Sequence, residues 1–418
     1  MLRALLRLRH EKANLLGYSN YAQLSLETKG AESSDEVLGF LRDLVKQSKP
    51  LLEREAGQLK DFAAAQGVSD LQAWDYEYYV QQYRQKKYGI AEAKLREYFP
   101  VEQVLERLLR VVEKLFGVTF VEQRSVDSWH EDVRVYEVQD NGKAIGYIAI
   151  DLFARPGKPD QCFEFTIRSR HVTAAGEVIK PINVLFCNFL PAVGDAPALL
   201  SFLELRKLFH EFGHCLHQVF SRASNWRLSH DEGIGRDEVE FRGKILEQWA
   251  LAPECLLAMS AHYKTGKQAP RQLINDWLAS QKAQSGLKLA KELRAALIDL
   301  ELHLHANAAV GDAQAIADRI TSEVLVLPLP ANDRFANGFD YMVTGYEAGY
   351  FVYQWAELFA ADTFARFEEE GVFNPLTGRF LRNTIFAPGA SQPMSASFQA
   401  FRGRPVSNEA FLRLAGLL

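Results

Sequence analysis

The residues that most constrain this chain are 208 to 218, with the sequence LFHEFGHCLHQ. They place three histidines and one glutamate in an otherwise helix-forming segment. On an α-helix, residues four apart lie on the same face, so His210 and His214 can direct their imidazoles to one point. Two imidazoles at this spacing are typical of a metal site. The alternative is a pair of partly buried histidines whose nitrogens are satisfied by hydrogen bonds within the fold.

Glu211 lies between these histidines in the sequence and is turned by about 100° around the helix axis from His210. It therefore stays near a metal without being a natural ligand on the same face, and this position suits a general base. His217 lies on the turn after His214. Three ligands from one straight helix would need an awkward spread of directions, so we interpret His217 as a packing residue or a support for a ligand.

A zinc site with an open fourth position needs a third protein ligand, which must come from another element. Residues 229–250 provide candidates, because Asp237, Glu240 and Glu247 fall broadly on one face of a predicted helix. We expect Glu240 to be the third ligand. We expect Asp237 to accept the outer N–H of a ligand histidine, and Glu247 to lie next to the ligands without binding the metal. A solvated surface carboxylate is the alternative for each of them. The expected cofactor is one Zn²⁺ per chain, which His, His and Glu ligation favours.

The rest of the sequence predicts a mainly α-helical fold with one small sheet. Residues 1–125 have helical periodicity. Within residues 126–200, VRVYEV and IGYIAIDLF flank an Asn-Gly turn at 141–142, and CFEFTIRS and INVLFCNF add strands to a mainly antiparallel sheet. Helical periodicity returns in residues 201–418. The sequence has no repeat or long linker, so we expect a single region over residues 1–418.

Composition and charge argue against several classes of partner. The net charge is −5 and there is no block of lysine and arginine, so we expect no nucleic acid and no membrane as partners. No apolar run reaches the length that spans a bilayer. Four scattered cysteines suit a reducing compartment, and we expect a cytoplasmic protein. Residues 1–12 have some features of a mitochondrial transit peptide, but their leucine stripe favours the first amphipathic helix of the fold.

These residues resemble the thimet oligopeptidase and oligopeptidase A family of zinc metallopeptidases. The family has FHEFGH, a glycine-containing loop, D-x-V-E and E-x-W, and this order is matched by residues 209–214, Gly233, DEVE at 237–240, and Glu247 with Trp249. The similarity runs from LRHEKANLLGYSNYA near the start to FRGRPVSNEAFLR near the end. It therefore covers essentially the whole chain.

The resemblance implies a zincin-like (gluzincin-like) helical body with a deep channel that admits short unstructured peptides and excludes folded proteins. It also implies zinc-dependent peptide hydrolysis, with His210, His214 and Glu240 as zinc ligands and Glu211 as the catalytic base. The rival interpretation is a zinc-containing peptide-binding protein with impaired or no catalysis. A third is a helical scaffold with incidental histidines, which would hold no stoichiometric metal.

The stretch TGYEAGYFVY, residues 344–353, is a second candidate part of the site. Its glycines predict a mobile backbone, and its tyrosine hydroxyls can donate to a developing oxyanion. From the sequence alone, aromatic residues at this spacing are more typical of core packing. The resemblance instead implies that Tyr346 and Tyr353 stabilise the tetrahedral intermediate and that Tyr350 contacts substrate. The predicted substrate-binding residues around these tyrosines also include Tyr341, Gly345 and Gly349.

The chain departs from the family pattern in ways that bear on peptide specificity and rate. Tyr341 stands where the family has a histidine, FRGK at 241–244 replaces LPSQ, and PDQCFEF at 159–165 replaces a glycine-rich strand beside which a peptide lies. The family also carries a further helical N-terminal region, and this chain begins part-way through the pattern. It is therefore a fragment, or its cleft is more open, or another chain covers the channel.

Overall fold

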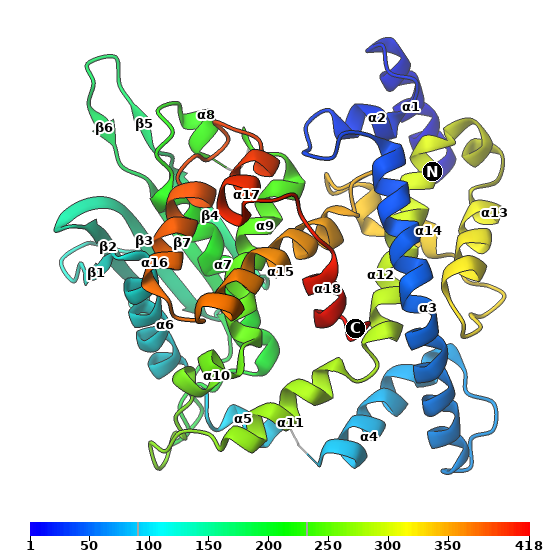
Figure 1. Ribbon diagram of the computed structural model, residues 1–418, viewed down its shortest axis with the longest axis horizontal. Helices are drawn as coiled ribbons and strands as arrows, with labels where there is room; N and C mark the ends of the chain where they lie inside the picture. The colour runs from blue at the N-terminus through cyan, green and yellow to red at the C-terminus, as the bar shows by residue number, and fades with distance from the viewer. Residues whose placement is uncertain (90–91, 231–232) are drawn as a thin grey trace. The chain divides into compact units, whose positions relative to one another are not determined.

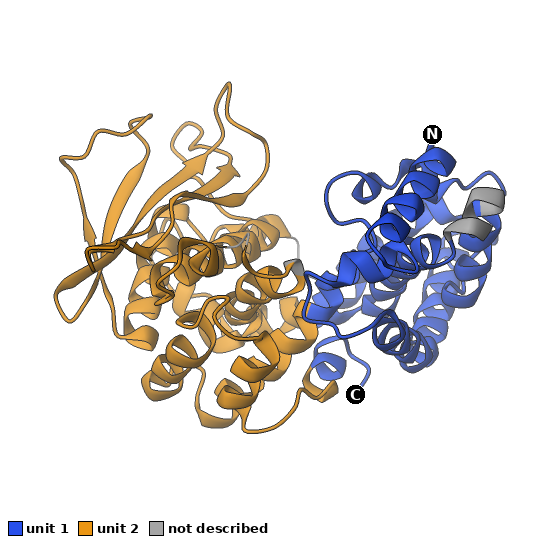
Figure 2. Cartoon of the chain, turned by 90° about the horizontal axis from the view of Figure 1, so that it is seen from above, with its two compact units in different colours: residues 1–89, 279–355, 411–418 blue, residues 90–278, 356–410 orange. Residues whose placement is uncertain are grey.

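The described residues are mainly helical and include a five-stranded sheet (Figure 1). The computed structural model describes residues 1–89, 92–230 and 233–418. The chain folds into two compact units, each assembled from segments that are distant in the sequence (Figure 2). The single region expected over the whole chain stays a prediction. Unit 1 comprises residues 1–89, 279–355 and 411–418, and unit 2 comprises residues 90–278 and 356–410.

Unit 1 is built from helices. The amphipathic helix predicted at the start of the chain is α1 (Leu2–Leu15). The long helices α3 (Ser34–Ala64) and α12 (Ser285–Leu304) pack against each other, and the buried Glu55 accepts a 2.8 Å hydrogen bond from the Gly286 N–H at the start of α12. The other elements are α2 (Tyr21–Leu26), η1 (Ala73–Asp75), α4 (Tyr76–Tyr88), α13 (Ala306–Val324), α14 (Phe335–Gly338), η4 (Asp340–Met342) and most of α18 (Glu409–Leu414).

Unit 2 contains the sheet, in the order β1-β2-β3-β7-β4. The predicted hairpin is confirmed: β2 (Arg134–Asp140) and β3 (Lys143–Phe153) pair antiparallel, and Asn141 and Gly142 have φ of 49° and 75°. The strands β4 (Phe163–Arg168) and β7 (Ile182–Phe189) also lie where the sequence predicts them. β7 pairs antiparallel with β4 and parallel with β3, so the sheet is mixed, although antiparallel pairing prevails among its described strands.

One expectation for the helical region 1–125 was wrong. Helix α6 (Val101–Phe116) ends at Gly117, which has a φ of 69°, and β1 (Thr119–Glu122) follows it as a strand. This segment pairs antiparallel with the outer edge of β2, so a partner distant in the sequence decides its conformation.

In unit 2, helix α7 (Phe202–Phe220) packs against the sheet strands β7, β4 and β3 and against α9 (Arg236–Glu247). In the described parts of the chain, no helix combines the length and the apolar character that crossing a membrane requires. The other elements that lie wholly or mostly in this unit are α5 (Glu92–Arg96), β5 (His171–Val172), β6 (Val178–Ile179), α8 (Trp226–Ser229), η3 (Gln248–Leu251), α10 (Pro253–Met259), α11 (Arg271–Lys282), α15 (Val352–Glu370), α16 (Pro375–Leu381), η5 (Arg382–Phe386) and α17 (Met394–Arg402).

Helices α7 and α9 meet backbone to backbone at Gly213. A Cβ atom added there would lie 2.6 Å from the carbonyl oxygen of Arg242 and 3.0 Å from the Cα of Gly243. Both of these atoms belong to the main chain of α9, so neither can rotate away. The glycine therefore sets how closely the two helices approach.

Replacing Gly213 with alanine is expected to destabilise the fold by about 1–3 kcal/mol, because α9 must move away from α7. Thermal unfolding monitored by circular dichroism measures this effect. The control is Gly39→Ala in α3, where a Cβ meets no atom within 4 Å and the better helix propensity of alanine should leave stability equal or slightly higher. Equal melting temperatures for Gly213→Ala and the unmodified protein would contradict the close contact.

Candidate metal centre

Helix α7 is held firmly in unit 2. At its start, the Ser201 hydroxyl accepts from the Glu204 N–H at 3.2 Å, and the Glu204 carboxylate accepts from the Ser201 N–H at 2.7 Å. This reciprocal pair satisfies two donors that a helix N-terminus leaves free. Further along, the buried Asn183 side chain of β7 donates to the Cys215 carbonyl at 3.0 Å. The helix that carries the two histidines is therefore fixed both at its end and along its length.

The structure brings His210, His214 and Glu240 together. One donor atom from each lies within 4.8 Å of the others, and the three come from α7 and α9. The Nε2 atoms of His210 and His214 are 3.1 Å apart, and Nε2 of His210 is 3.5 Å from Oε2 of Glu240. Tetrahedral ligands at zinc distances are about 3.3 Å apart, so these atoms fit around one such ion. Two imidazoles and one carboxylate are also a donor set that zinc accepts.

The other nitrogen of His210 is held by Glu247, whose Oε2 lies 3.3 Å from Nδ1. Two cations contact Glu247. Arg206 donates a hydrogen bond from Nε to Oε1 at 2.9 Å, and Nζ of Lys244 lies 3.0 Å from Oε2. Lys244 also lies 2.9 Å from Glu357. Burial opposes the charged form of Glu247, but Lys244 and Arg206 outweigh it and hold the pKa of Glu247 well below its usual value. A charged Glu247 fixes the ring of His210 and leaves Nε2 for a metal.

The electrostatics of the group favour a bound cation. Burial alone would lower the pKa of His210, but hydrogen bonds with Glu240 and Glu247 raise it to about 10. Burial raises the pKa of Glu211 to about 7; the charge of Glu240 acts in the same direction, and His210 opposes it. Three carboxylates thus surround the imidazoles. A divalent cation would neutralise this excess of negative charge, and a glutamate that titrates near neutral pH suits the role of a general base.

The other predicted residues of α7 and α9 are buried around this group. His217 and Asp237 are both fully buried, on α7 and in the first turn of α9. Among the described residues, the group that could hold a metal includes neither of them. Their predicted roles, His217 in packing or support and Asp237 in orienting a ligand, stay predictions.

The departure at 241–244 is built into the site, which the sequence analysis did not anticipate. A Cβ on Gly243 would lie 2.7 Å from both Cε1 of His210 and Nε2 of His214, so the glycine leaves room for the two rings. Lys244 joins the Glu247 network described above. Its spacing of three residues from Glu247 was a local signal for this pair. The roles of Arg206 and Glu357 had no such signal, because both lie far from Glu247 in the sequence.

The predicted tyrosines belong to unit 1 and form one cluster. The rings of Tyr346 and Tyr353 stack, with centroids 5.5 Å apart and planes 18° from parallel. Tyr341 lies edge-on to Tyr350, with centroids 4.7 Å apart. Burial raises the pKa of Tyr350 to about 12, and the charge of Glu292 acts in the same direction. The four phenols, including the one that replaces the family's histidine, are therefore close neighbours.

A single carboxylate holds the backbone between these tyrosines. The buried Asp299 accepts hydrogen bonds from three consecutive N–H groups, those of Ala348 at 2.9 Å, Gly349 at 2.9 Å and Tyr350 at 3.0 Å. Ala348 has a φ of 51°, an unfavourable value for a residue with a Cβ. Three bonds to a charged acceptor offset that cost. Asp299, which the sequence analysis did not single out, thus sets the position of Tyr350.

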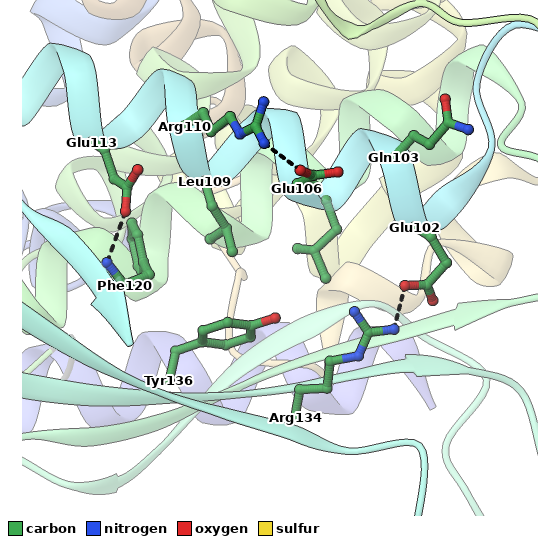
Figure 3. A pocket seen from close by; sticks show the side chains of 10 residues that line it. Glu102, Gln103, Glu106, Leu109, Arg110, Glu113, Phe120, Arg134 and Tyr136 are labelled. Atoms are coloured by element: carbon green, nitrogen blue, oxygen red, sulfur yellow. Dashed lines mark hydrogen bonds and ion pairs between the residues drawn. The ribbon is translucent and has the colours of Figure 1, made fainter. Parts of the chain in front are cut away.

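A pocket of about 430 Å³ lies elsewhere in unit 2, between α6 and the strands β1 and β2 (Figure 3). Its charged side chains bind one another: Arg134 pairs with Glu102, and Arg110 pairs with Glu106 at 2.5 Å. Glu113 accepts from the Phe120 N–H at 3.0 Å. The paired side chains neutralise each other's charge, and the pocket contains none of His210, His214 and Glu240. It is therefore a weaker candidate site than the group formed by those three residues.

Comparison with known proteins agrees with this geometry. The model of Peptidase family M3 matches residues 1–417. Oligopeptidase A of Escherichia coli (strain K12) is 40% identical over 419 residues, which cover 99% of this chain and 61% of that protein. A probable cytosolic oligopeptidase A of Arabidopsis thaliana is 35% identical over 433 residues, again covering 99% and 61%. The chain thus spans about three fifths of the length of these relatives.

The fold is shared more widely. The solved structure of a Pyrococcus furiosus carboxypeptidase superposes with a TM-score of 0.59 at 14% identity, covering 100% of this chain and 73% of that one. At this identity the likeness concerns the fold alone. The two proteins therefore share an arrangement of helices and sheet although few of their residues are identical.

Proposed function

This chain belongs to peptidase family M3, and on that premise we propose that it is a zinc metallopeptidase that hydrolyses short peptides. The observation that carries the proposal is the convergence of His210, His214 and Glu240, with Glu211 on the same helix. Nε2 of each histidine and a carboxylate oxygen of Glu240 would hold one Zn²⁺. Zinc, when bound, polarises the scissile carbonyl and lowers the pKa of water to near 7.

The residues of the chain supply the proton transfers. Glu211 takes the proton of the attacking water and delivers it to the leaving amine. Its pKa, which burial raises to about 7, allows both steps at neutral pH. Glu247 keeps His210 oriented, and Asp237 is assigned the same task for a ligand histidine. No covalent intermediate with the protein is needed.

We assign oxyanion binding to Tyr346 and Tyr353 and substrate contact to Tyr350 and Tyr341, with Gly345 and Gly349 giving the segment its shape. The family resemblance and the shared cluster of rings support this assignment. Phenol hydroxyls are suitable donors to a tetrahedral intermediate. The substrates are short unstructured peptides that enter a deep channel, in a cytoplasmic protein.

Cleavage of a fluorescence-quenched peptide of about ten residues tests the proposal. We expect the zinc-loaded protein to cleave it, a chelator to abolish cleavage, and added Zn²⁺ to restore it. Mass spectrometry of the products distinguishes internal cleavage from release of C-terminal dipeptides. A folded protein substrate is the control and should stay intact. Saturable peptide binding without cleavage would favour the rival interpretation, a zinc-containing peptide-binding protein. The observation that motivates this rival is the replacement of the family's histidine by Tyr341.

Replacing Asp299 with asparagine is expected to lower kcat by roughly 10- to 100-fold, because the tyrosine segment loses a charged acceptor and shifts. Metal content should change little, because the metal residues belong to the other unit. KM should rise, because Asp299 positions Tyr350, which is assigned to substrate contact. Steady-state kinetics with elemental analysis measures this. Asp43→Asn, an exposed carboxylate on α3, is the matched control. If kcat falls no more than in the control, Asp299 has no role in turnover.

A further inference from the structure

Two cysteines lie near each other in unit 2: Cys187 is in β7, and Cys162 immediately precedes β4. Strands β4 and β7 are antiparallel, with Phe163 opposite Phe186. One step outward in the same register places Cys162 opposite Cys187. The Cβ atoms of opposed residues in such a pair are about 4.5–5.5 Å apart. A disulfide needs about 3.5–4.5 Å, so a small movement at the end of β4 would join the two sulfurs.

Both thiols face helix α7. Asn183 of β7 points to α7, because its side chain donates to the Cys215 carbonyl there. Side chains two and four residues along a strand share one face, so Cys187 points the same way. Cys162, directly opposite, shares that face. Cys187 is fully buried, whereas Cys162, just before the edge strand β4, is half-buried and is the more exposed of the two.

The two thiols differ in chemistry as well as in exposure. A hydrogen bond from Cys187 lowers the pKa of Cys162 to about 6; burial opposes this shift, and the Asn188 N–H and the charge of Lys207 assist it. Burial and the neighbouring Cys162 raise the pKa of Cys187 well above its usual value. Cys162 can therefore react first as the nucleophile, and the buried, protonated Cys187 can react with it in a second step.

The pair also lies close to the proposed base. The charge of Cys162 contributes to the raised pKa of Glu211, and the backbone N–H of Glu164, two residues further along β4, acts on Glu211 in the opposite direction. Glu211 in turn contributes to the raised pKa of Cys187. A group attached to Cys162 would therefore lie beside Glu211.

We propose that Cys162 is a redox modification site that reacts with the disulfide of a low-molecular-weight thiol and is then resolved by Cys187. In the first step the Cys162 thiolate attacks one sulfur of the small disulfide; a mixed disulfide forms, and the other half leaves as a thiolate. In the second step Cys187 loses its proton to that thiolate or to solvent and attacks the Cys162 sulfur. The second half leaves, and the two cysteines are oxidised while the small disulfide is reduced to two thiols.

The consequence for turnover rests on the proposed peptidase function. The mixed disulfide places a bulky group beside Glu211, and the internal disulfide draws β4 toward β7 and removes the thiolate. Either product is expected to inhibit peptide cleavage until a reductant removes it.

The test of the modification itself needs no activity. The zinc-loaded protein is treated with iodoacetamide at pH 7 and its peptides are mapped by mass spectrometry over time. Cys162 is expected to react at least about ten times faster than the fully buried Cys255, whose pKa is raised by burial. Equal rates at the two cysteines would overturn the proposal.

Oxidised glutathione then tests the resolving step. The unmodified protein is expected to end with a Cys162–Cys187 disulfide, whereas Cys187→Ser and Cys187→Ala should accumulate glutathione on Cys162. Cys162→Ser should leave Cys187 unmodified. A glutathione adduct that persists on Cys162 of the unmodified protein would exclude Cys187 as the resolving residue.

The last measurement is peptide cleavage before and after oxidised glutathione, each protein being compared with its own untreated sample. We expect a loss of at least about ten-fold that dithiothreitol reverses, and no loss in Cys162→Ser. Oxidation with unchanged cleavage would overturn the inhibitory role. If untreated protein cleaves no peptide, the proposed function fails, and the mass-spectrometric results still decide the modification site.

Discussion

Replacing Glu211 with glutamine is expected to lower peptide cleavage by roughly 10²- to 10⁴-fold while zinc stays bound at one ion per chain. The amide keeps the size of the side chain but cannot take a proton from water, and proton transfer by a positioned base contributes a rate factor of this size. Since Glu211 is not one of the three converging metal residues, the metal content should not change. Steady-state cleavage of a quenched peptide and elemental analysis of the same sample measure both quantities.

The matched control for this change is Glu254→Gln. Glu254 is an exposed residue of α10 and lies 4.0 Å from Arg271, so its neutralisation should leave the rate within about two-fold. Cleavage by Glu211→Gln at the unmodified rate would exclude Glu211 as the base. Loss of zinc from Glu211→Gln would show instead that this carboxylate takes part in holding the metal.

Replacing His214 with alanine is expected to weaken zinc binding by more than about 100-fold and to reduce cleavage to the level of the chelated protein. Loss of an outer partner of a ligand alone costs 10- to 100-fold in affinity, so loss of a ligand should cost more. Binding to the native state adds about 2.7 kcal/mol of stability at a metal concentration of 100 Kd. The unmodified protein should therefore melt higher with zinc, and His214→Ala should not.

His217→Ala provides the comparison from the same helix. His217 is fully buried but lies outside the converging group, so its removal should lower the melting temperature and still leave a zinc-dependent increase. Equal loss of zinc from both variants would show that the metal is held differently from our assignment. This pair of variants separates damage to the fold from loss of a ligand.

Features that depend on residues close together in the sequence could be predicted from it. Helix α7 follows from periodicity and from the Ser201–Glu204 capping pair, and the two histidines share a face because they are one turn apart. The hairpin follows from the turn at Asn141, where a positive φ is needed. Each of these features depends on residues that are near one another in the chain.

The features that were missed depend on contacts between distant segments. β1 is a strand because the edge of β2 accepts it, and Gly243 matters because α9 passes against the rings of His210 and His214. Lys244 and Glu357 meet across more than a hundred residues of sequence. Neither propensity nor spacing carries this information, because the free energy comes from burial and charge pairing in the folded chain.

The sequence by itself determined that two imidazoles and a glutamate lie together on one apolar helix, because an α-helix repeats every 3.6 residues wherever it forms. Only the tertiary structure decided which carboxylates surround them. Glu240 and Glu247 reach His210 because Gly213 lets α9 approach α7. Asp299, on α12, reaches the backbone of the tyrosine segment with its carboxylate. Packing between helices, which depends on side-chain volume and charge at many distant positions, therefore turned a local motif into a site.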